Sequence, residues 1–193
     1  MAFTRRVAAL AGAGVTVAVA LGFWATGTEP ETSGVGAEGT RATVVRVVDG
    51  DTVDMRLASG AVERVRILGI DTPEVVDPRR PAQCFGAEAS ARLKSLLPPG
   101  RSTRLVGDPT QDARDQYGRR LAHVFLDGAT GTVEDGTNVG RALIEGGFAR
   151  HYVYQRTPTV HGREYASAQA TARAGGAGLW SAATCDGRTT PVR

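Results

Sequence analysis

Carboxylates and arginines recur beside the turns of this sequence, and they define its candidate chemistry. The segment 70–74 (IDTPE) places Asp71 and Glu74 around a turn, and Arg66 precedes them on an alternating, strand-like stretch. The segment 49–52 (DGDT) forms a second acidic turn, and 115–119 (DQYGR) opens a strand further downstream. Carboxylates at strand ends beside arginines can hold a divalent cation against a phosphate. The pattern therefore predicts a phosphodiesterase.

Each cluster also has an ordinary structural interpretation. Asp-Gly pairs are common in hairpin turns, and the segment 71–74 could cap a helix or close a turn. Arg66 and Arg119 could form surface ion pairs, and Tyr152 and Tyr154 could pack at strand ends. The catalytic interpretation depends on the joint occurrence of the clusters in one order.

The composition is that of a globular domain, and its net charge is a weak indicator of nucleic-acid binding. The chain has 193 residues, 41% of them hydrophobic and 22% charged, which suits one domain with a substantial core. The formal charge is +3, and leaving out Arg5 and Arg6 of a removable N-terminal segment gives 3 − 2 = +1. Attraction to phosphate must therefore come from clustered arginines. Lys94 is the one lysine, which favours guanidinium contacts or reflects codon usage alone.

The N-terminus is typical of an exported protein. Arg5 and Arg6 precede an apolar run that extends to Ala25, so we expect residues 1–27 to be a signal peptide or an uncleaved membrane anchor. The polar residues 28–40 are expected to be a flexible linker. The positive-inside rule then places the rest of the chain outside the cytoplasm, secreted or anchored to the outer face of the cytoplasmic membrane.

Periodicity predicts an α+β domain over residues 41–182, followed by a C-terminal tail over 183–193. Five short strands are expected, over 43–48, 52–57, 62–70, 102–106 and 119–126. Three helices are expected, over 87–97, 138–145 and 165–174, each ending at proline or glycine. A helix after the third strand and two after the fifth favour a small, partly open five-stranded Greek-key β-barrel of the OB-fold type.

These features together resemble the staphylococcal nuclease (thermonuclease) family. The resemblance covers residues 41–181, and it rests on 49–52, 66–74 and 117–119 in the family's order and approximate spacing. The later segments 152–154 (YVY) and 179–181 (LWS) also fit. One acidic turn alone would be a weak signal, but three ordered clusters are a strong one.

The resemblance implies a role for each matching position. Asp51 and Asp71, with the backbone carbonyl of Thr72, would bind Ca²⁺, a hard cation that prefers oxygen ligands. Glu74 would orient or deprotonate the attacking water. The phosphate would be contacted by Arg66 and Arg119. The nucleotide pocket would be lined by Tyr117, Tyr152 and Tyr154. Both DNA and RNA would be substrates, and we expect a monomer with no obligate protein partner.

The sequence departs from the best-known family member at several places. Gln116 replaces a lysine next to Tyr117, and the loop 75–83 carries two arginines that could reach the nucleic-acid backbone. Cys84 and Cys185 are additional, and because an exported chain usually pairs an even number of cysteines, we expect a disulfide, with two free thiols as the alternative. The three histidines, His123, His151 and His161, lack ligand spacing and are assigned no chemistry.

Two other classes of function compete with a nuclease. A non-catalytic nucleic-acid-binding OB-fold module would be expected to lose at least one of the five matching charged residues, and none is lost. A calcium-binding domain without a nucleic-acid partner would leave the paired arginines without a purpose.

Overall fold

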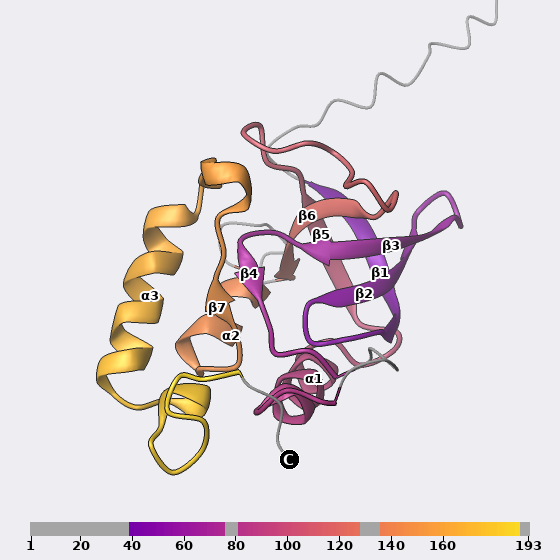
Figure 1. Ribbon diagram of the computed structural model, residues 1–193. Coiled ribbons are helices and arrows are strands. Elements are labelled where there is room, and N and C mark those ends of the chain that lie inside the picture. The colour runs from indigo at the N-terminus through magenta and orange to yellow at the C-terminus, as the bar shows by residue number, and fades with distance from the viewer. Residues whose placement is uncertain (1–38, 76–80, 128–135, 190–193) are drawn as a thin grey trace, which may run out of the picture. The chain divides into compact units, whose positions relative to one another are not determined.

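The computed structural model describes residues 39–75, 81–127 and 136–189, and five of its strands form a closed barrel (Figure 1). The barrel strands are β1 (Thr40–Val47), β2 (Thr52–Leu57), β3 (Val62–Ile67), β5 (Ser102–Val106) and β6 (Arg120–Leu126). Their order around the barrel is β1-β2-β3-β6-β5. All neighbours are antiparallel except β3 and β6, which are parallel. The predicted α+β, OB-type fold is confirmed. The barrel was expected to be partly open, but it is closed, because β1 pairs with both β2 and β5.

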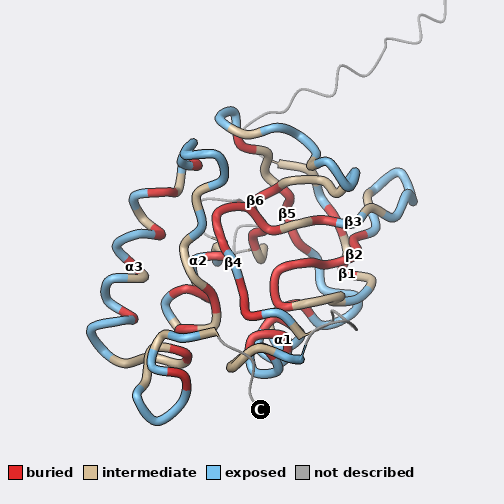
Figure 2. The backbone as a smooth tube through the Cα atoms, viewed as in Figure 1, coloured by how far each residue is buried: buried red, intermediate tan, exposed pale blue. Residues whose placement is uncertain are grey.

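Alternation along the strands builds the core. Val53 and Met55 of β2, and Val65 and Ile67 of β3, are fully or almost fully buried, and Arg56 and Arg64 at alternating positions are exposed. Figure 2 shows buried stretches along β2 and β3. Helix α1 adds Leu93 to this core. The interior is therefore filled by side chains, and any substrate site must lie on the surface of the barrel.

The third strand is shorter than the sequence pattern predicted. The expected strand 62–70 ends at Ile67, because Gly69 adopts a left-handed backbone (φ +75°) that interrupts the pleat. A separate short strand, β4 (Ile70–Asp71), then pairs with β7 (Arg150–His151), and Asp71 lies opposite Arg150. This break turns Asp71 away from the barrel strands and toward the C-terminal half of the domain.

Three α-helices and two 3₁₀ turns complete the domain. They are α1 (Gly86–Leu96), α2 (Val139–Glu145), α3 (Gly162–Ala174), η1 (Tyr154–Arg156) and η2 (Gly178–Trp180). Asn138 caps α2 by accepting a hydrogen bond from the Arg141 N–H (3.1 Å). Helix α3 begins three residues earlier than predicted, at Gly162, because glycine is a poor helix former and did not indicate a helix start.

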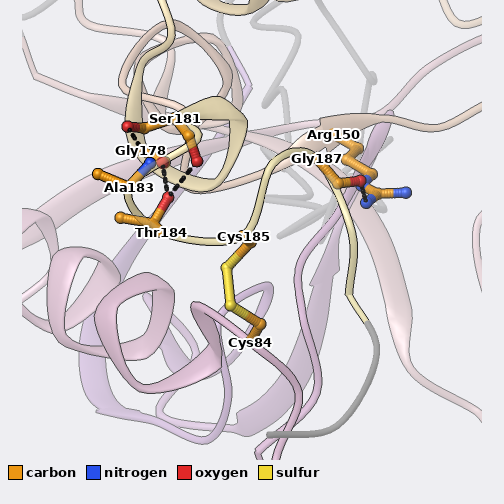
Figure 3. Close-up of a disulfide and its surroundings, with 8 residues drawn as sticks. All are labelled: Cys84, Arg150, Gly178, Ser181, Ala183, Thr184, Cys185 and Gly187. Carbon is orange, nitrogen blue, oxygen red and sulfur yellow. Dashed lines mark hydrogen bonds between the residues drawn. A yellow bond between two sulfur atoms is a disulfide. The ribbon is translucent and has the colours of Figure 1, made fainter.

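Cys84 and Cys185 form the predicted disulfide, with their Cα atoms 6.0 Å apart (Figure 3). It joins Cys84, two residues before the start of α1, to the C-terminal segment across 101 residues of sequence. Arg150 donates a hydrogen bond to the Gly187 carbonyl, which holds the same segment near β7 (Figure 3). Residues 183–189 of the predicted tail are therefore tied to the domain.

The predicted signal peptide or anchor, and all of the predicted linker except its last two residues, lie outside the described residues. Thr40, the last of these, is already the first residue of β1. Within the described ranges, no helix has the length and apolar character needed to span a membrane.

Candidate active site

A surface cleft of about 690 Å³ gathers most of the residues singled out from the sequence. Its lining includes six of them, namely Arg66, Asp71, Tyr117, Arg119, Tyr152 and Tyr154. They come from β3, β4, the turn before β6, and the segment around η1, which are far apart along the chain. The fold therefore brings both predicted phosphate-binding arginines and all three predicted nucleotide-binding tyrosines to one place.

Arg66 joins the two carboxylates predicted to bind metal. Its Nη2 lies 3.0 Å from Asp51 Oδ2 and 3.8 Å from Asp71 Oδ1. Its Nη1 donates to the carbonyls of Ile67 and Ile70, both at 3.0 Å, across the break between β3 and β4. Only 16% of the side chain is exposed. Arg66 therefore fixes the turn that presents Asp71 as well as facing the cleft.

Asp51 and Thr72 form the buried back of the site. The Thr72 hydroxyl and backbone N–H both donate to Asp51 Oδ2, at 3.2 and 3.4 Å. Gly50 allows this approach, because a Cβ at that position would lie 2.6 Å from Thr72 Oγ1. Any side chain at position 50 would thus push the two acidic turns apart.

The carboxylates of this region crowd one another. Desolvation raises the pKa of Asp71. The positive charge of Arg66 acts to lower this pKa, while the negative charges of Asp51 and Glu74 act to raise it. Burial raises the pKa of Asp49 to about 7, and a hydrogen bond with Glu74 adds to this effect. Asp49 and Glu74 are therefore close enough to share a proton, and the region concentrates negative charge.

Gln83 holds the backbone of Glu74 from the opposite side. The Glu74 N–H donates to Gln83 Oε1, and the Gln83 N–H donates to the Glu74 carbonyl, both at 2.8 Å. Gly86, the first residue of α1, packs so closely that a Cβ there would lie 3.0 Å from the Glu74 carbonyl oxygen. The start of α1 thus positions Glu74, although Glu74 itself does not line the cleft.

Asp115 orients Arg119. Its Oδ2 lies 2.6 Å from Arg119 Nε, and its Oδ1 accepts the N–H groups of Tyr117 (2.9 Å) and Arg119 (3.0 Å). Burial acts to raise the pKa of Asp115, but the hydrogen bonds from Arg119 outweigh it and lower the pKa. The turn residue Gly118 is left-handed (φ +77°). Arg119 is therefore held in place while 28% of its side chain remains exposed to the cleft.

The three tyrosines are exposed rather than packed in the core. Tyr117 is 74% exposed, and Tyr152 and Tyr154 are 46% and 49% exposed. The guanidinium of Arg119 lies 5.4 Å from the centre of the Tyr117 ring. Accessible aromatic faces beside guanidinium groups suit stacking of bases along a phosphate backbone.

The described residues contain no group of three or more His, Cys, Asp or Glu side chains arranged to hold a metal ion. The donor set predicted for Ca²⁺ is smaller, with two carboxylates, one carbonyl and water. Asp51 and Asp71 both reach the Arg66 guanidinium, so their oxygens point toward a common region. Hard oxygen donors in an acidic, crowded environment fit a divalent cation of this type. The contribution of the Thr72 carbonyl stays a prediction.

Sequence reasoning missed three supporting residues and one cluster. Gln83 and Asp115 were noted only as neighbours of other motifs, and Asp49 only as a turn former. The three histidines, which showed no common spacing, surround Tyr165, with ring centres 5.8 to 6.2 Å from the Tyr165 ring. The contact of Gln83 with Glu74, and those of His123 and His151 with Tyr165, join separate segments and left no local signal. Asp115 and Arg119 are only four residues apart, so their opposite charges at this spacing were a local signal for the pair.

The closed five-strand barrel with three helices, carrying arginines and carboxylates at one cleft, defines an α+β protein of the OB-fold class. The chain belongs to the staphylococcal nuclease family, since the family model described as Staphylococcal nuclease homologue matches residues 64–182.

Several curated relatives are similar to this chain. An uncharacterised protein of Bacillus anthracis is 34% identical over 147 residues, covering 76% of this chain and 63% of the relative. The SPbeta prophage-derived endonuclease YokF of Bacillus subtilis is 41% identical over 114 residues, covering 58% and 35%. The thermonuclease of Staphylococcus intermedius is 46% identical over 83 residues, covering 43% and 47%. The matches thus span between about a third and two thirds of the length of these relatives.

Proposed function

We propose that this protein is a calcium-dependent nuclease that hydrolyses phosphodiester bonds of DNA and RNA with low sequence specificity. The observation that carries the proposal is the meeting of Arg66, Arg119 and Asp71 with three exposed tyrosines at one cleft. Relatives named endonuclease and thermonuclease support the same class of activity.

In this proposal the two arginines bind the scissile phosphate. Their guanidinium groups offset the negative charge that otherwise repels an attacking hydroxide, and pre-placed charge of this kind is often the largest catalytic contribution. Asp115 keeps Arg119 oriented, so little reorganisation is needed when charge builds on the phosphate. Tyr117, Tyr152 and Tyr154 hold the neighbouring nucleotides through their ring faces, which accept any base.

Glu74 is the proposed general base. Its backbone is held by Gln83 and α1, and its carboxyl group lies within hydrogen-bonding reach of Asp49. A carboxylate in contact with water can remove a proton during attack, which contributes roughly 10²–10⁴-fold in rate. Asp51, Asp71 and Thr72 would hold Ca²⁺, which would supply positive charge next to the phosphate and favour ionisation of bound water.

We also propose that the protein works outside the cytoplasm, either secreted or anchored through its N-terminal segment. The disulfide supports this location, because disulfides persist in oxidising compartments. Fractionation of cells that express the full chain tests it, and recovery of the protein in the cytoplasm would contradict it.

A plasmid-degradation assay on the purified protein tests the function. We expect degradation with calcium and none with a chelator, while Mg²⁺ should substitute poorly because it demands tighter octahedral geometry. Binding of the plasmid without degradation in calcium would instead favour the non-catalytic nucleic-acid-binding module.

A further inference from the structure

The outer face of strands β1, β2 and β3 carries a row of arginines next to the proposed active site. On β2 the core residues Val53 and Met55 point inward, so alternation places Asp54 and Arg56 on the outer face, although only 6% of Asp54 is exposed. Arg64 on β3 lies directly opposite Asp54. Arg64 also precedes the catalytic candidate Arg66 by two residues on the same strand, so both arginines lie on this outer face.

A β-bulge in β1 adds Arg46 to this row. Ala42 and Val44 are buried, and strict alternation would turn residue 46 toward the core as well. The pairing register shifts between Val44 and Arg46, so that Arg46 lies opposite Asp54 on the outer face. The bulge thus re-aims a charged side chain that regular pleating would bury.

The charges on this face do not balance. Arg46 Nη2 and Arg64 Nε both bind the single carboxylate of Asp54, at 2.9 and 2.8 Å. The hydrogen bond from Arg64 lowers the pKa of Asp54, which keeps this carboxylate ionised and its two partners oriented. Their side chains are 62% and 46% exposed, and Arg56 donates to the neutral Gly60 carbonyl. The face therefore presents a net excess of guanidinium groups to solvent.

A hollow of about 710 Å³ connects this face to the active-site cleft. Its lining includes Asp54, Val62 and Arg64 of this face, together with Asp49, Tyr117 and Arg119. Tyr117 and Arg119 also line the active-site cleft. The two depressions therefore meet at Arg119, which we place on the scissile phosphate, and at Tyr117, which we place on a neighbouring nucleotide.

We propose that this outer face, formed by Arg46, Arg56 and Arg64 with the exposed ring of Tyr117, is a subsite for a single strand of nucleic acid. The strand would continue across it from the scissile phosphate, away from Tyr152 and Tyr154. In OB folds the face of strands 2 and 3 is the surface that binds oligonucleotides, and arginines along such a face bind the backbone without reading its sequence. This inference rests on the proposed nuclease function, because the catalytic cleft defines where the strand enters.

The test compares a long substrate with a short one in the double variant Arg46→Ala/Arg56→Ala, which leaves Arg64 paired with Asp54. For a single-stranded oligonucleotide of about 20 nucleotides, longer than the ~4–16 that one OB fold covers, we expect KM to rise on the order of tenfold at low salt with kcat unchanged. The dependence of log KM on log salt should become shallower by about 1.4, since each phosphate contact contributes about 0.7. Hydrolysis of a dinucleotide, which ends before this face, should be unaffected.

Arg163→Ala is the matched control. Arg163 is an exposed arginine of α3, a helix that packs on α2 and β7, so its removal changes net charge without touching the proposed subsite. An unchanged KM for the long substrate in the double variant, or an equal rise in Arg163→Ala, would overturn the inference. If the double variant melts at a lower temperature than the parent, Arg46→Gln alone replaces it, and the salt dependence should then become shallower by about 0.7.

Failure of the proposed function can be told apart from failure of the subsite. A parent protein that cleaves neither substrate would contradict the nuclease function. Fluorescence anisotropy of the labelled oligonucleotide with chelator present would still measure binding. Loss of affinity in Arg46→Ala/Arg56→Ala but not in Arg163→Ala would then uphold the subsite, and equal affinity in all three proteins would reject it.

Discussion

Arg66 and Arg119 differ in how much of the fold depends on them. Arg119 is oriented by one carboxylate, Asp115, and its loss would leave the turn held by the backbone hydrogen bonds to that carboxylate. Arg66 caps two carbonyls and pairs with the buried Asp51, so its loss would also leave that carboxylate without its guanidinium partner. Residue-scale tests must therefore separate catalysis from stability.

We expect Arg119→Ala and Glu74→Ala each to lose at least about 2.7–4 kcal/mol of transition-state stabilisation, the size of one lost transition-state donor. Melting temperature should change little for Arg119→Ala, whereas Arg66→Ala should lose both activity and stability. Steady-state kinetics with thermal melts checks this. Turnover close to that of the parent in either single variant would contradict the role assigned to that residue.

Asp51→Asn should weaken calcium binding, because a neutral amide removes a full ligand charge while keeping the shape of the side chain. Titration calorimetry with CaCl₂ alone measures this without any need for activity. An unchanged calcium affinity would mean that the ion, if bound, lies elsewhere.

Gln83→Ala should lower kcat more than it raises KM, because the lost hydrogen bond positions Glu74 rather than the substrate. In a Glu74→Ala background the same change should have little further effect on kcat. Gln169→Ala removes a similar hydrogen bond, which the His151 N–H donates to Gln169 Oε1 (2.9 Å), and it is the control, whose effect should not depend on Glu74. Additive effects of Gln83→Ala and Glu74→Ala on kcat would show that Gln83 does not act through Glu74.

At the scale of elements, the disulfide joins the start of α1 to the C-terminal segment. Neither cysteine lines the active-site cleft, while the adjacent Gln83 contacts Glu74 through its own backbone and side chain. The crosslink therefore restrains the ends of the domain without reaching the phosphate site.

The variant Cys84→Ser/Cys185→Ser should unfold more easily, by up to about 4.7 kcal/mol for a closed loop of about a hundred residues. Native strain and residual structure in the unfolded chain reduce that figure. Activity well below the melting temperature should be retained. Chemical denaturation and kinetics check both expectations, and a fall in kcat with unchanged stability would instead assign the disulfide a positioning role.

At the scale of the whole molecule, a buried polar network joins the barrel to the C-terminal half. His123 Nε2 lies 2.9 Å from Asp108 Oδ2, and both side chains are fully buried. Asp108 also accepts the Val160 N–H (2.8 Å), while the Tyr165 hydroxyl donates to Asn138 (2.8 Å). This network fixes the segments before α3 and after β5 that form one wall of the cleft.

The network predicts loss of stability in acid. Burial acts to raise the pKa of Asp108, but hydrogen bonds from His123 and Thr110 outweigh it and hold the pKa at about 2. This value lies below the unfolded pKa of about 3.9, so the contribution is present above pH ~4 and is lost as the pH falls toward about 2. Burial lowers the pKa of His123, so protonation of the unfolded chain below about pH 6.5 also favours unfolding.

Denaturant unfolding between about pH 2 and 7 should therefore show stability that falls with acidification, with roughly 2 kcal/mol attributable to Asp108. Asp108→Asn should be less stable at neutral pH and should flatten the curve below about pH 4. A parent curve that is flat over this interval, or an unchanged slope in Asp108→Asn, would contradict the role of the network.

Local sequence pattern predicted most of the secondary-structure elements and the family resemblance. Alternation and turn residues predicted the five barrel strands, the three helices and the disulfide, because these depend on backbone preferences and on redox compartment. The break at Gly69 was missed, since apolar residues continue on both sides of it, and the left-handed backbone of Gly69 and the pairing of β4 with β7 appear only in the structure.

What the sequence determined by itself was the set of chemical groups and their order, through clusters only a few residues long. What the tertiary structure alone decided was which groups meet. Barrel closure and the β4–β7 pair bring Arg66, Arg119 and the tyrosines to one cleft, the start of α1 holds Glu74 through Gln83, and the bulge turns Arg46 outward. The physical reason is that these contacts join segments distant along the chain, whose meeting depends on strand register and core packing rather than on local preference.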